Sequence, residues 1–430
     1  MSSAKSNSDS KIKTHNFKIG TPNPKSLASS PLIALASGIL MGLTVAPVGA
    51  WFLAWVALAP LWVLVIKSAK PQNSSLPYSL LPTPYSLLWG IGYHGVALFW
   101  ITGIHPMTWM GVSWINSLAI ALFCWIFITL WGAALVVTWA IGMRVILNWS
   151  GLAFKQETLK PTSNLKIQNG LTRILIGTAL WCGLESLWSS GALWWSSLAY
   201  TQSAHNLAIL HLGQISGDNT ITAAIVLVNA AIAEAWINRP RQEKTNSTLT
   251  FVTFASWRFV PHKVYISLAA GLIIALHLLG YSLYTHPLTQ PPDTALKVGI
   301  IQGNVPNQIK LYPEGIQRAI EGYTQGYKTL AEQGVDAVLT PEGALPFLWN
   351  QVMRTSFYSA VKEKGVVAWV GAFGEAGSSY TNSLFTLTGT GEVYSRYNKV
   401  KLVPIGEYIP FERYLGNLIG RLSPLDEHQV

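Results

Sequence analysis

Charge is scarce in this sequence, and acidic charge is the scarcest. Only 11% of the 430 residues are charged, with 19 Asp and Glu against 29 Lys and Arg, and there are just two cysteines. Half of the residues are hydrophobic. This composition excludes a disordered chain and a scaffold held by disulfides. It is typical of a protein with several membrane segments.

The few charges are distributed unevenly along the chain. Up to Thr294 there are 17 Lys and Arg against 7 Asp and Glu, whereas from Ala295 onward there are 12 of each. The net charge of +10 therefore lies in the first part, and does not by itself indicate a nucleic-acid partner. Seventeen of the 19 tryptophans also precede Ala295, where aromatic belts at membrane interfaces would use them.

Seven segments of the first part are apolar enough to be membrane helices. Residues 26–66 contain no charge and fit two helices, broken at Ala46-Pro47-Val48-Gly49. The uncharged run 111–143 is short for two spans and predicts one long, tilted helix. Further spans are predicted at 87–102, 174–189, 221–237 and 264–284. We therefore expect a disordered basic tail over 1–31, a transmembrane helical domain over 32–285 and a separate domain over 295–430.

Basic residues alternate between the predicted loops. The tail carries five, and the loops 67–70, 144–173 and 239–263 carry two, five and five, while the intervening loops carry none. Loops rich in Lys and Arg stay in the cytoplasm. The pattern predicts a cytoplasmic N-terminus and an extracytoplasmic domain after the seventh span.

Some polar residues fall inside the apolar segments. Glu185 and Glu234 are candidates for functional groups, because an unpaired charge in lipid is costly; pairing within the helical bundle is the alternative. Cys124 and Cys182 are interpreted as buried small hydrophobic residues. No metal-ligand spacing is evident among the histidines, and we expect neither a metal nor a cofactor. The histidines considered are His94, His105, His205, His211 and His277.

The domain after Ala295 predicts alternating strands and helices. Strands are expected at 296–302, 336–340, 366–373, 382–387 and 392–397, and helices at 315–332 and 356–364. This alternation is typical of an α/β domain, in which functional residues follow the strands. Glu342 and Lys399 each come directly after a predicted strand.

Several motifs of the chain resemble the apolipoprotein N-acyltransferase family, the membrane-bound branch of the nitrilase (carbon–nitrogen hydrolase) superfamily. The resemblance extends from about Leu32 over nearly the whole chain. It is carried by Gln302-Gly303-Asn304-Val305-Pro306, Pro341-Glu342-Gly343-Ala344-Leu345-Pro346, Tyr380-Thr381-Asn382-Ser383 and the run 397–410, and in the membrane part by Trp181, Glu185, Trp195 and Tyr200-Thr201-Gln202. One departure is Leu311, where many relatives carry tryptophan.

The resemblance implies a reaction and its residues. Glu342 would be the general base, Lys399 would stabilise a thiolate and an oxyanion, and Glu407 would assist. Lys401 is equally basic, but the register against Leu402-Val403-Pro404 favours Lys399. The family transfers an acyl chain from a phospholipid to a cysteine, and then to the amino terminus of an S-diacylglyceryl-cysteine on an apolipoprotein. A bacterial inner-membrane location and an extracytoplasmic nitrilase-like sandwich follow from the same resemblance.

The nucleophilic cysteine that the family uses is absent from this chain. The family places it a few dozen residues after the run 402–410, whereas the sequence ends at Val430, and both cysteines lie in predicted spans. We therefore expect a domain incomplete at its C-terminus. The alternatives are a catalytically inactive remnant, a membrane-anchored amidase of the same superfamily, and a non-catalytic scaffold or transporter. No inverted repeat supports a transporter.

Overall fold

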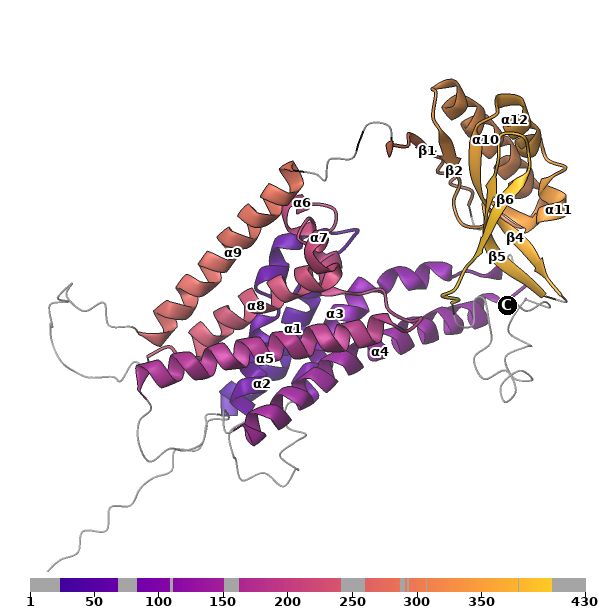
Figure 1. Cartoon of the computed structure of the whole chain (residues 1–430). Coiled ribbons are helices and arrows are strands. Elements are labelled where there is room, and N and C mark those ends of the chain that lie inside the picture. The colour runs from indigo at the N-terminus through magenta and orange to yellow at the C-terminus, as the bar shows by residue number, and fades with distance from the viewer. Residues whose placement is uncertain are drawn as a thin grey trace, which may run out of the picture.

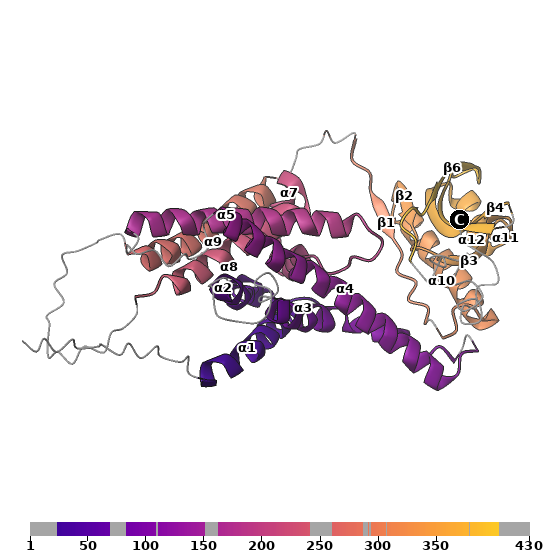
Figure 2. The ribbon, with the colours of Figure 1, turned by 90° about the horizontal axis from the view of Figure 1, so that it is seen from below.

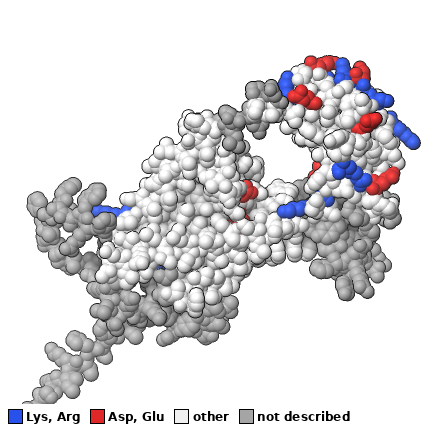
Figure 3. All heavy atoms as spheres, in the orientation of Figure 1, with Lys and Arg blue, Asp and Glu red and all other residues white. Residues whose placement is uncertain are grey.

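A computed structural model describes residues 24–68, 83–108, 111–150, 162–240, 260–286, 291, 294–306, 308–377 and 379–403. The described chain is helical up to Thr285 and continues as an α/β unit from Val298 (Figure 1). The view in Figure 3 shows the same division in charge: the surface of the helical part is almost free of coloured atoms, whereas Lys, Arg, Asp and Glu gather on the α/β unit.

Helices occupy all seven segments that the sequence predicts as spans. They are α1 (Pro24–Gly42), α2 (Ala59–Ser68, after the 3-10 turn η1, Trp51–Trp55), α3 (Thr83–Ala97), α4 (Trp114–Trp149), α5 (Ser163–Ser189), α8 (Asp218–Ile237) and α9 (Pro261–Thr285). Within the described residues, four stretches are both long and apolar enough to cross a membrane: Trp51–Ser68, α4, α8 and α9. The helices are thus confirmed, while the count of seven spans stays a prediction.

Shorter elements lie between the long helices. The predicted span 87–102 is not one helix to its end, because α3 stops at Ala97 and the 3-10 turn η3 (Phe99–Ile104) follows it. The elements η5 (Leu198–Gln202), α6 (Leu207–Leu210) and α7 (Gly213–Ser216) lie between α5 and α8, where the sequence predicts no helix. Helix α5 also begins eleven residues before the predicted span. Its N-cap is Thr162, whose Oγ1 accepts a hydrogen bond from the Leu165 N–H at 3.4 Å.

The core of the bundle is built around tryptophans. Trp62, Trp89, Trp139 and Trp181 are at most 2% exposed, and the rings of Trp62 and Trp181 each lie 5.3 Å from that of Trp139. The indole N–H groups of Trp89 and Trp139 donate to the carbonyl oxygens of Ala57 and Gly177. For these four residues the prediction of an interfacial belt is wrong, because their rings are buried in the core of the bundle, where the N–H groups of Trp89, Trp139 and Trp181 find acceptors inside the protein.

Helix α4 is much longer than a bilayer requires. Its 36 residues span about 54 Å at 1.5 Å per residue, against about 30 Å of bilayer hydrocarbon. Figure 2 shows its N-terminal part running past the neighbouring helices towards the α/β unit. The prediction of one long helix over this run is confirmed.

In the part that the structure describes, the α/β unit contains a mixed sheet of six strands. The strands are β1 (Val298–Ile300), β2 (Ala337–Leu339), β3 (Leu345–Leu348), β4 (Val367–Ala376), β5 (Ser379–Leu387) and β6 (Val393–Asn398). Their order is β1-β2-β4-β5-β6, with β3 also paired to β4; the β1–β2, β2–β4 and β3–β4 pairs are parallel, and the β4–β5 and β5–β6 pairs are antiparallel. The five predicted strands are present, and β3 is an addition.

Within the described residues, the helices of this unit are α10 (Pro313–Glu332), α11 (Trp349–Val352) and α12 (Ser356–Lys364). Tyr327 of α10 and Phe357 of α12 are fully buried in one core with Val338 and Val370 of the sheet. Alternating buried side chains on the central strands meet the apolar faces of the two helices, as expected for an α/β layer. Strand β6, in contrast, is exposed at all six residues.

Candidate functional site

The turn that carries Glu342 directly follows β2. Thr340 Oγ1 accepts a hydrogen bond from the Gly371 N–H at 3.0 Å and donates to the Trp369 carbonyl at 3.2 Å, so the end of β2 is tied to β4. A Cβ atom on Gly371 would lie 2.1 Å from the Pro341 carbonyl oxygen. Gly343 has a φ of +55°, which favours glycine, and turns the chain away behind Glu342. The backbone of the turn before Glu342 is thus held against β4.

Lys399 comes from another part of the sheet, two strands beyond β4 in the strand order. It directly follows β6, and its backbone N–H donates to the Asn382 carbonyl of β5 at 2.8 Å, which extends the strand pairing by one residue. The neighbouring Asn398 is held by Ser383 Oγ at 2.9 Å and by Arg396 Nε at 2.8 Å, both donating to its Oδ1. The pairing of β6 with β5 therefore sets the position of the Lys399 backbone.

The two predicted catalytic residues are in contact. Lys399 Nζ lies 2.9 Å from Glu342 Oε1, and Asn382 Nδ2 donates to the same oxygen at 2.5 Å. The Glu342 side chain is 60% exposed and that of Lys399 is 26% exposed. A carboxylate beside an ammonium can accept a proton from a nucleophile while the cation stabilises developing negative charge. An exposed ion pair of this length also occurs on ordinary surfaces, so the geometry alone assigns no catalytic role.

The remaining predicted site residues have different places. Lys401, the alternative to Lys399, points elsewhere: its Nζ donates to the Ser189 carbonyl at the end of α5 at 2.9 Å. Glu407 lies outside the described residues. Leu311, the departure from the family pattern, is 56% exposed. Cys124 and Cys182 lie on α4 and α5 as free, partly buried thiols.

Sequence reasoning gave no individual role to two polar residues near the pair. Asn382 is a direct partner of Glu342, although it had entered only as part of a family motif. Lys310 Nζ would lie 3.9 Å from a Cβ atom on Gly343, next to Glu342. The local sequence around Lys310 does not predict this approach, because it depends on contact between residues that are far apart in the chain.

Both glutamates of the helical bundle are paired within it. Glu185 is 4% exposed; its Oε1 accepts from Ser197 Oγ, from the Leu198 N–H at 3.1 Å and from Thr222 Oγ1 at 3.2 Å, and its Oε2 accepts from Trp181 Nε1 at 3.0 Å. The carboxylate thus joins α5, η5 and α8.

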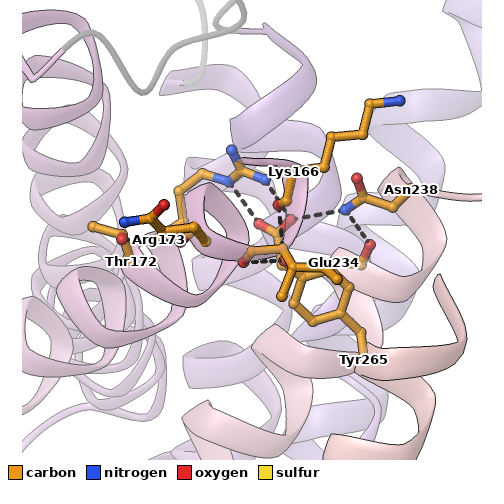
Figure 4. A network of polar contacts seen from close by, with 8 residues as sticks. Lys166, Thr172, Arg173, Glu234, Asn238 and Tyr265 are labelled. Atoms are coloured by element: carbon orange, nitrogen blue, oxygen red, sulfur yellow. Dashed lines mark hydrogen bonds and ion pairs between the residues drawn. The ribbon is translucent and has the colours of Figure 1, made fainter. Parts of the chain in front are cut away.

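Glu234 forms a two-pronged ion pair with Arg173. The Arg173 Nε and NH2 groups donate to the two carboxylate oxygens at 2.8 and 2.5 Å, and both side chains are almost fully buried (Figure 4). Asn238 and Tyr265 extend this network: Asn238 Nδ2 donates to Glu234, and the Tyr265 hydroxyl donates to the carbonyls of Lys166 and Ile167. Pairing within the bundle, the structural alternative for these glutamates, is what the structure shows.

The histidines form no metal site in the part of the chain that the structure describes. No three His, Cys, Asp or Glu side chains gather there in an arrangement that could hold an ion. His94 Nδ1 instead lies 2.8 Å from Ser196 Oγ, and His277 Nε2 lies 3.2 Å from Asn206 Nδ2.

Comparison with known proteins relates the chain to one family. Residues 37–231 match the model of the apolipoprotein N-acyltransferase N-terminal domain. A curated apolipoprotein N-acyltransferase of Nostoc sp. is 58% identical over 390 residues, which cover 91% of this chain and 70% of the relative. The chain belongs to the apolipoprotein N-acyltransferase family.

Two further apolipoprotein N-acyltransferases support the same assignment. The protein of Synechocystis sp. is 44% identical over 90% of this chain and 72% of its own length. That of Thermosynechococcus vestitus is 37% identical over 89% of this chain and 65% of its own length. Together with the four apolar helical stretches, the family membership identifies a membrane protein.

Proposed function

We propose that this chain acts in the N-acylation of apolipoproteins, with a phospholipid as acyl donor and an N-terminal S-diacylglyceryl-cysteine as acceptor. The observation that carries the proposal is the Glu342–Lys399 pair. Two motif residues that lie 57 positions apart meet at 2.9 Å in a chain of the apolipoprotein N-acyltransferase family. Their residue types suit acyl transfer, since one accepts a proton and the other stabilises an oxyanion.

In the proposed reaction Glu342 is the general base and Lys399 the electrostatic partner. In the first step a thiolate attacks the ester carbonyl, a C–S bond forms, the C–O bond breaks, and the thiol proton passes through Glu342 to the leaving lysophospholipid oxygen. In the second step the amine forms the C–N bond, the C–S bond breaks, and the amine proton returns through Glu342 to the sulfur. Lys399 faces the negative charge of each intermediate, and Asn382 holds Glu342 in place. Glu407 is proposed as an assisting residue.

No cysteine of this sequence is assigned as the thiol of this scheme. Both cysteines of the sequence lie on bundle helices, and no contact joins either to Glu342 or Lys399 in the described residues. The thioester at a Glu–Lys–Cys triad therefore rests on the family resemblance. The alternatives are an inactive member of the family and a membrane-anchored amidase. The experiment below distinguishes them from an acyltransferase.

The proposal also includes the arrangement of the chain in the membrane. A seven-span domain over 32–285 follows a cytoplasmic tail over 1–31, and the nitrilase-like domain over 295–430 lies outside the inner membrane, facing the leaflet that holds both lipid substrates. The alternation of basic loops supports this orientation.

An acylation assay in phospholipid vesicles tests the roles of the pair. The chain and its Nostoc relative are compared, each with the wild-type sequence and with Glu342→Gln and Lys399→Ala at the aligned positions. Transfer of a labelled acyl chain to a diacylglyceryl peptide is followed by mass spectrometry. We expect a loss of about 10²-fold or more for each substitution.

The control is a second surface pair of the same length. Lys364 Nζ lies 2.9 Å from Glu332 Oε1, and Lys364→Ala is expected to leave the rate unchanged. Full activity of Glu342→Gln or Lys399→Ala would refute the assigned roles. If the relative loses activity with these substitutions while this chain has none in any form, the chain is the inactive family member. Cleavage of a labelled amide substrate, with release of its amine and without acyl transfer, would identify a membrane-anchored amidase.

A further inference from the structure

Lys401 joins the α/β unit to the helical bundle. Its Nζ donates to the main-chain carbonyl of Ser189 at 2.9 Å, a contact between residues 212 positions apart. Ser189 is the last residue of α5. The final carbonyls of a helix have no intrahelical donor and carry the negative end of the helix dipole. A lysine at this point satisfies one of these carbonyls and is attracted by the dipole.

The chain between Lys401 and the candidate site is very short. Lys399 is two residues away, so their Cα atoms are at most about 7 Å apart. Lys399 itself is fixed on both sides, by its backbone bond to Asn382 and by its ion pair with Glu342. A movement of Lys401 relative to the bundle therefore moves the Glu342–Lys399 pair with it.

The end of α5 that receives Lys401 is held firmly. One turn before Ser189, Glu185 accepts hydrogen bonds from η5 and α8, and Ser186 Oγ donates to Asn219 Oδ1 at 3.1 Å. Trp188 Nε1 donates to the Trp131 carbonyl of α4 at 3.2 Å. Three neighbouring elements thus immobilise this helix end, which makes it a defined docking point.

We infer that Lys401 is a positioning residue that docks the segment after β6 onto α5 and holds the Glu342–Lys399 pair at the surface of the bundle. The consequence of this docking rests on the proposed function: the protein should prefer acyl donors that are anchored in the bilayer. A lipid ester at the bundle surface reaches the pair only while the contact holds. The charged group of Lys401 does not take part in the chemistry.

The distance between two spin labels tests the docking directly. The whole chain, with Cys124 and Cys182 replaced by alanine, is labelled at Tyr394→Cys on β6 and Leu187→Cys on α5 and reconstituted in phospholipid nanodiscs. Both positions are well exposed, at 80% and 63%. Pulsed electron resonance then gives the distribution of distances with Lys401, Lys401→Met and Lys401→Arg.

We expect Lys401→Met to broaden the distribution and shift it to longer distances, since the side chain keeps its length and loses its charge. Lys401→Arg should restore the narrow distribution. Val400→Ala, at a residue that is 77% exposed, is the matched control and should change nothing. An unchanged distribution in Lys401→Met would overturn the inference, whether or not the protein transfers acyl chains. Conversely, Lys399→Ala should leave the distribution narrow while abolishing transfer.

A kinetic measurement separates positioning from chemistry. If transfer is found, Lys401→Met should raise the apparent KM for vesicle phospholipid about two- to fivefold, the factor that a charge at a helix end supplies. kcat should stay near that of the wild type, and Lys401→Arg should recover the lower KM. A loss in kcat with an unchanged KM would contradict a positioning role.

Discussion

At the scale of single residues, burial and bonding partners distinguish the carboxylates that stabilise the bundle from the carboxylate of the candidate site. The carboxylates of Glu185 and Glu234 are buried and satisfied by donors of their own bundle. Removing Arg173 would leave the Glu234 carboxylate as an uncompensated buried charge, which is costly. Glu342, by contrast, is more than half exposed and meets an ammonium and an amide at one oxygen. Of these three carboxylates, Glu342 is the one that is open to solvent.

Gly371 supplies a residue-scale prediction about the site. In Gly371→Ala the new Cβ would lie 2.1 Å from the Pro341 carbonyl oxygen, so the turn before Glu342 must shift. We expect a loss of stability of about 1–3 kcal/mol, as for other overpacked positions, together with reduced acyl transfer. Chemical denaturation and the vesicle assay measure the two effects.

Gly322→Ala is the control for this substitution. Gly322 lies within α10, and no atom comes within 4 Å of a Cβ placed on it. Alanine should stabilise this helix by up to about 1 kcal/mol and leave transfer unchanged. Equal losses in both variants would show that the contact at Pro341 does not position Glu342.

At the scale of elements, a buried tyrosine joins α10 to the start of β4. The Tyr327 hydroxyl donates to the Val366 carbonyl at 2.5 Å and accepts from the Val366 N–H at 3.2 Å. Burial raises the pKa of Tyr327 to about 12, and the hydrogen bond that its oxygen accepts from the Val366 N–H opposes this shift only in part. The helix and the strand therefore depend on the neutral hydroxyl.

Tyr327→Phe is expected to lower the stability of the α/β unit by about 1–3 kcal/mol, because two backbone groups of Val366 lose their partner. The raised pKa also predicts how the contribution of Tyr327 to stability changes with pH. A folded-state pKa raised above that of the unfolded chain contributes stability below pH 10, and this contribution is lost as the pH rises towards 12. The stability difference between wild type and Tyr327→Phe should therefore shrink over this range in denaturant titrations. A constant difference would contradict the assigned pKa.

Sequence periodicity predicts the long helices and most of the strands, but not the short elements or the environment of the core tryptophans. Apolar runs placed seven helices, and strand patterns placed β1, β2, β4, β5 and β6. The short β3 and the elements η5, α6 and α7 were not foreseen, because they lie in segments without a regular apolar pattern and form by packing on the bundle or on β4. The four core tryptophans were placed at interfaces, since composition cannot tell an indole facing lipid from one bonded inside the bundle.

At the scale of the whole molecule, the orientation in the membrane is open to a direct test. In the background without Cys124 and Cys182, single cysteines replace Lys11 in the tail and Tyr394 on the exposed β6. A thiol reagent that cannot cross the inner membrane should label Tyr394→Cys in spheroplasts and spare Lys11→Cys until the membrane is opened. The reverse pattern would refute the orientation derived from the basic loops.

The sequence by itself determined which segments are helical and apolar, where the charge balance changes near Ala295, and which motifs carry the family resemblance. These properties are local, or follow from composition. Only the tertiary structure decided that Lys399 meets Glu342 whereas Lys401 reaches Ser189. The family motif favours Lys399 over Lys401, but it does not say which group either side chain contacts. Their partners depend on the register of β6 against β5 and on the way the sheet approaches the end of α5, and both are set by packing between segments distant in the chain.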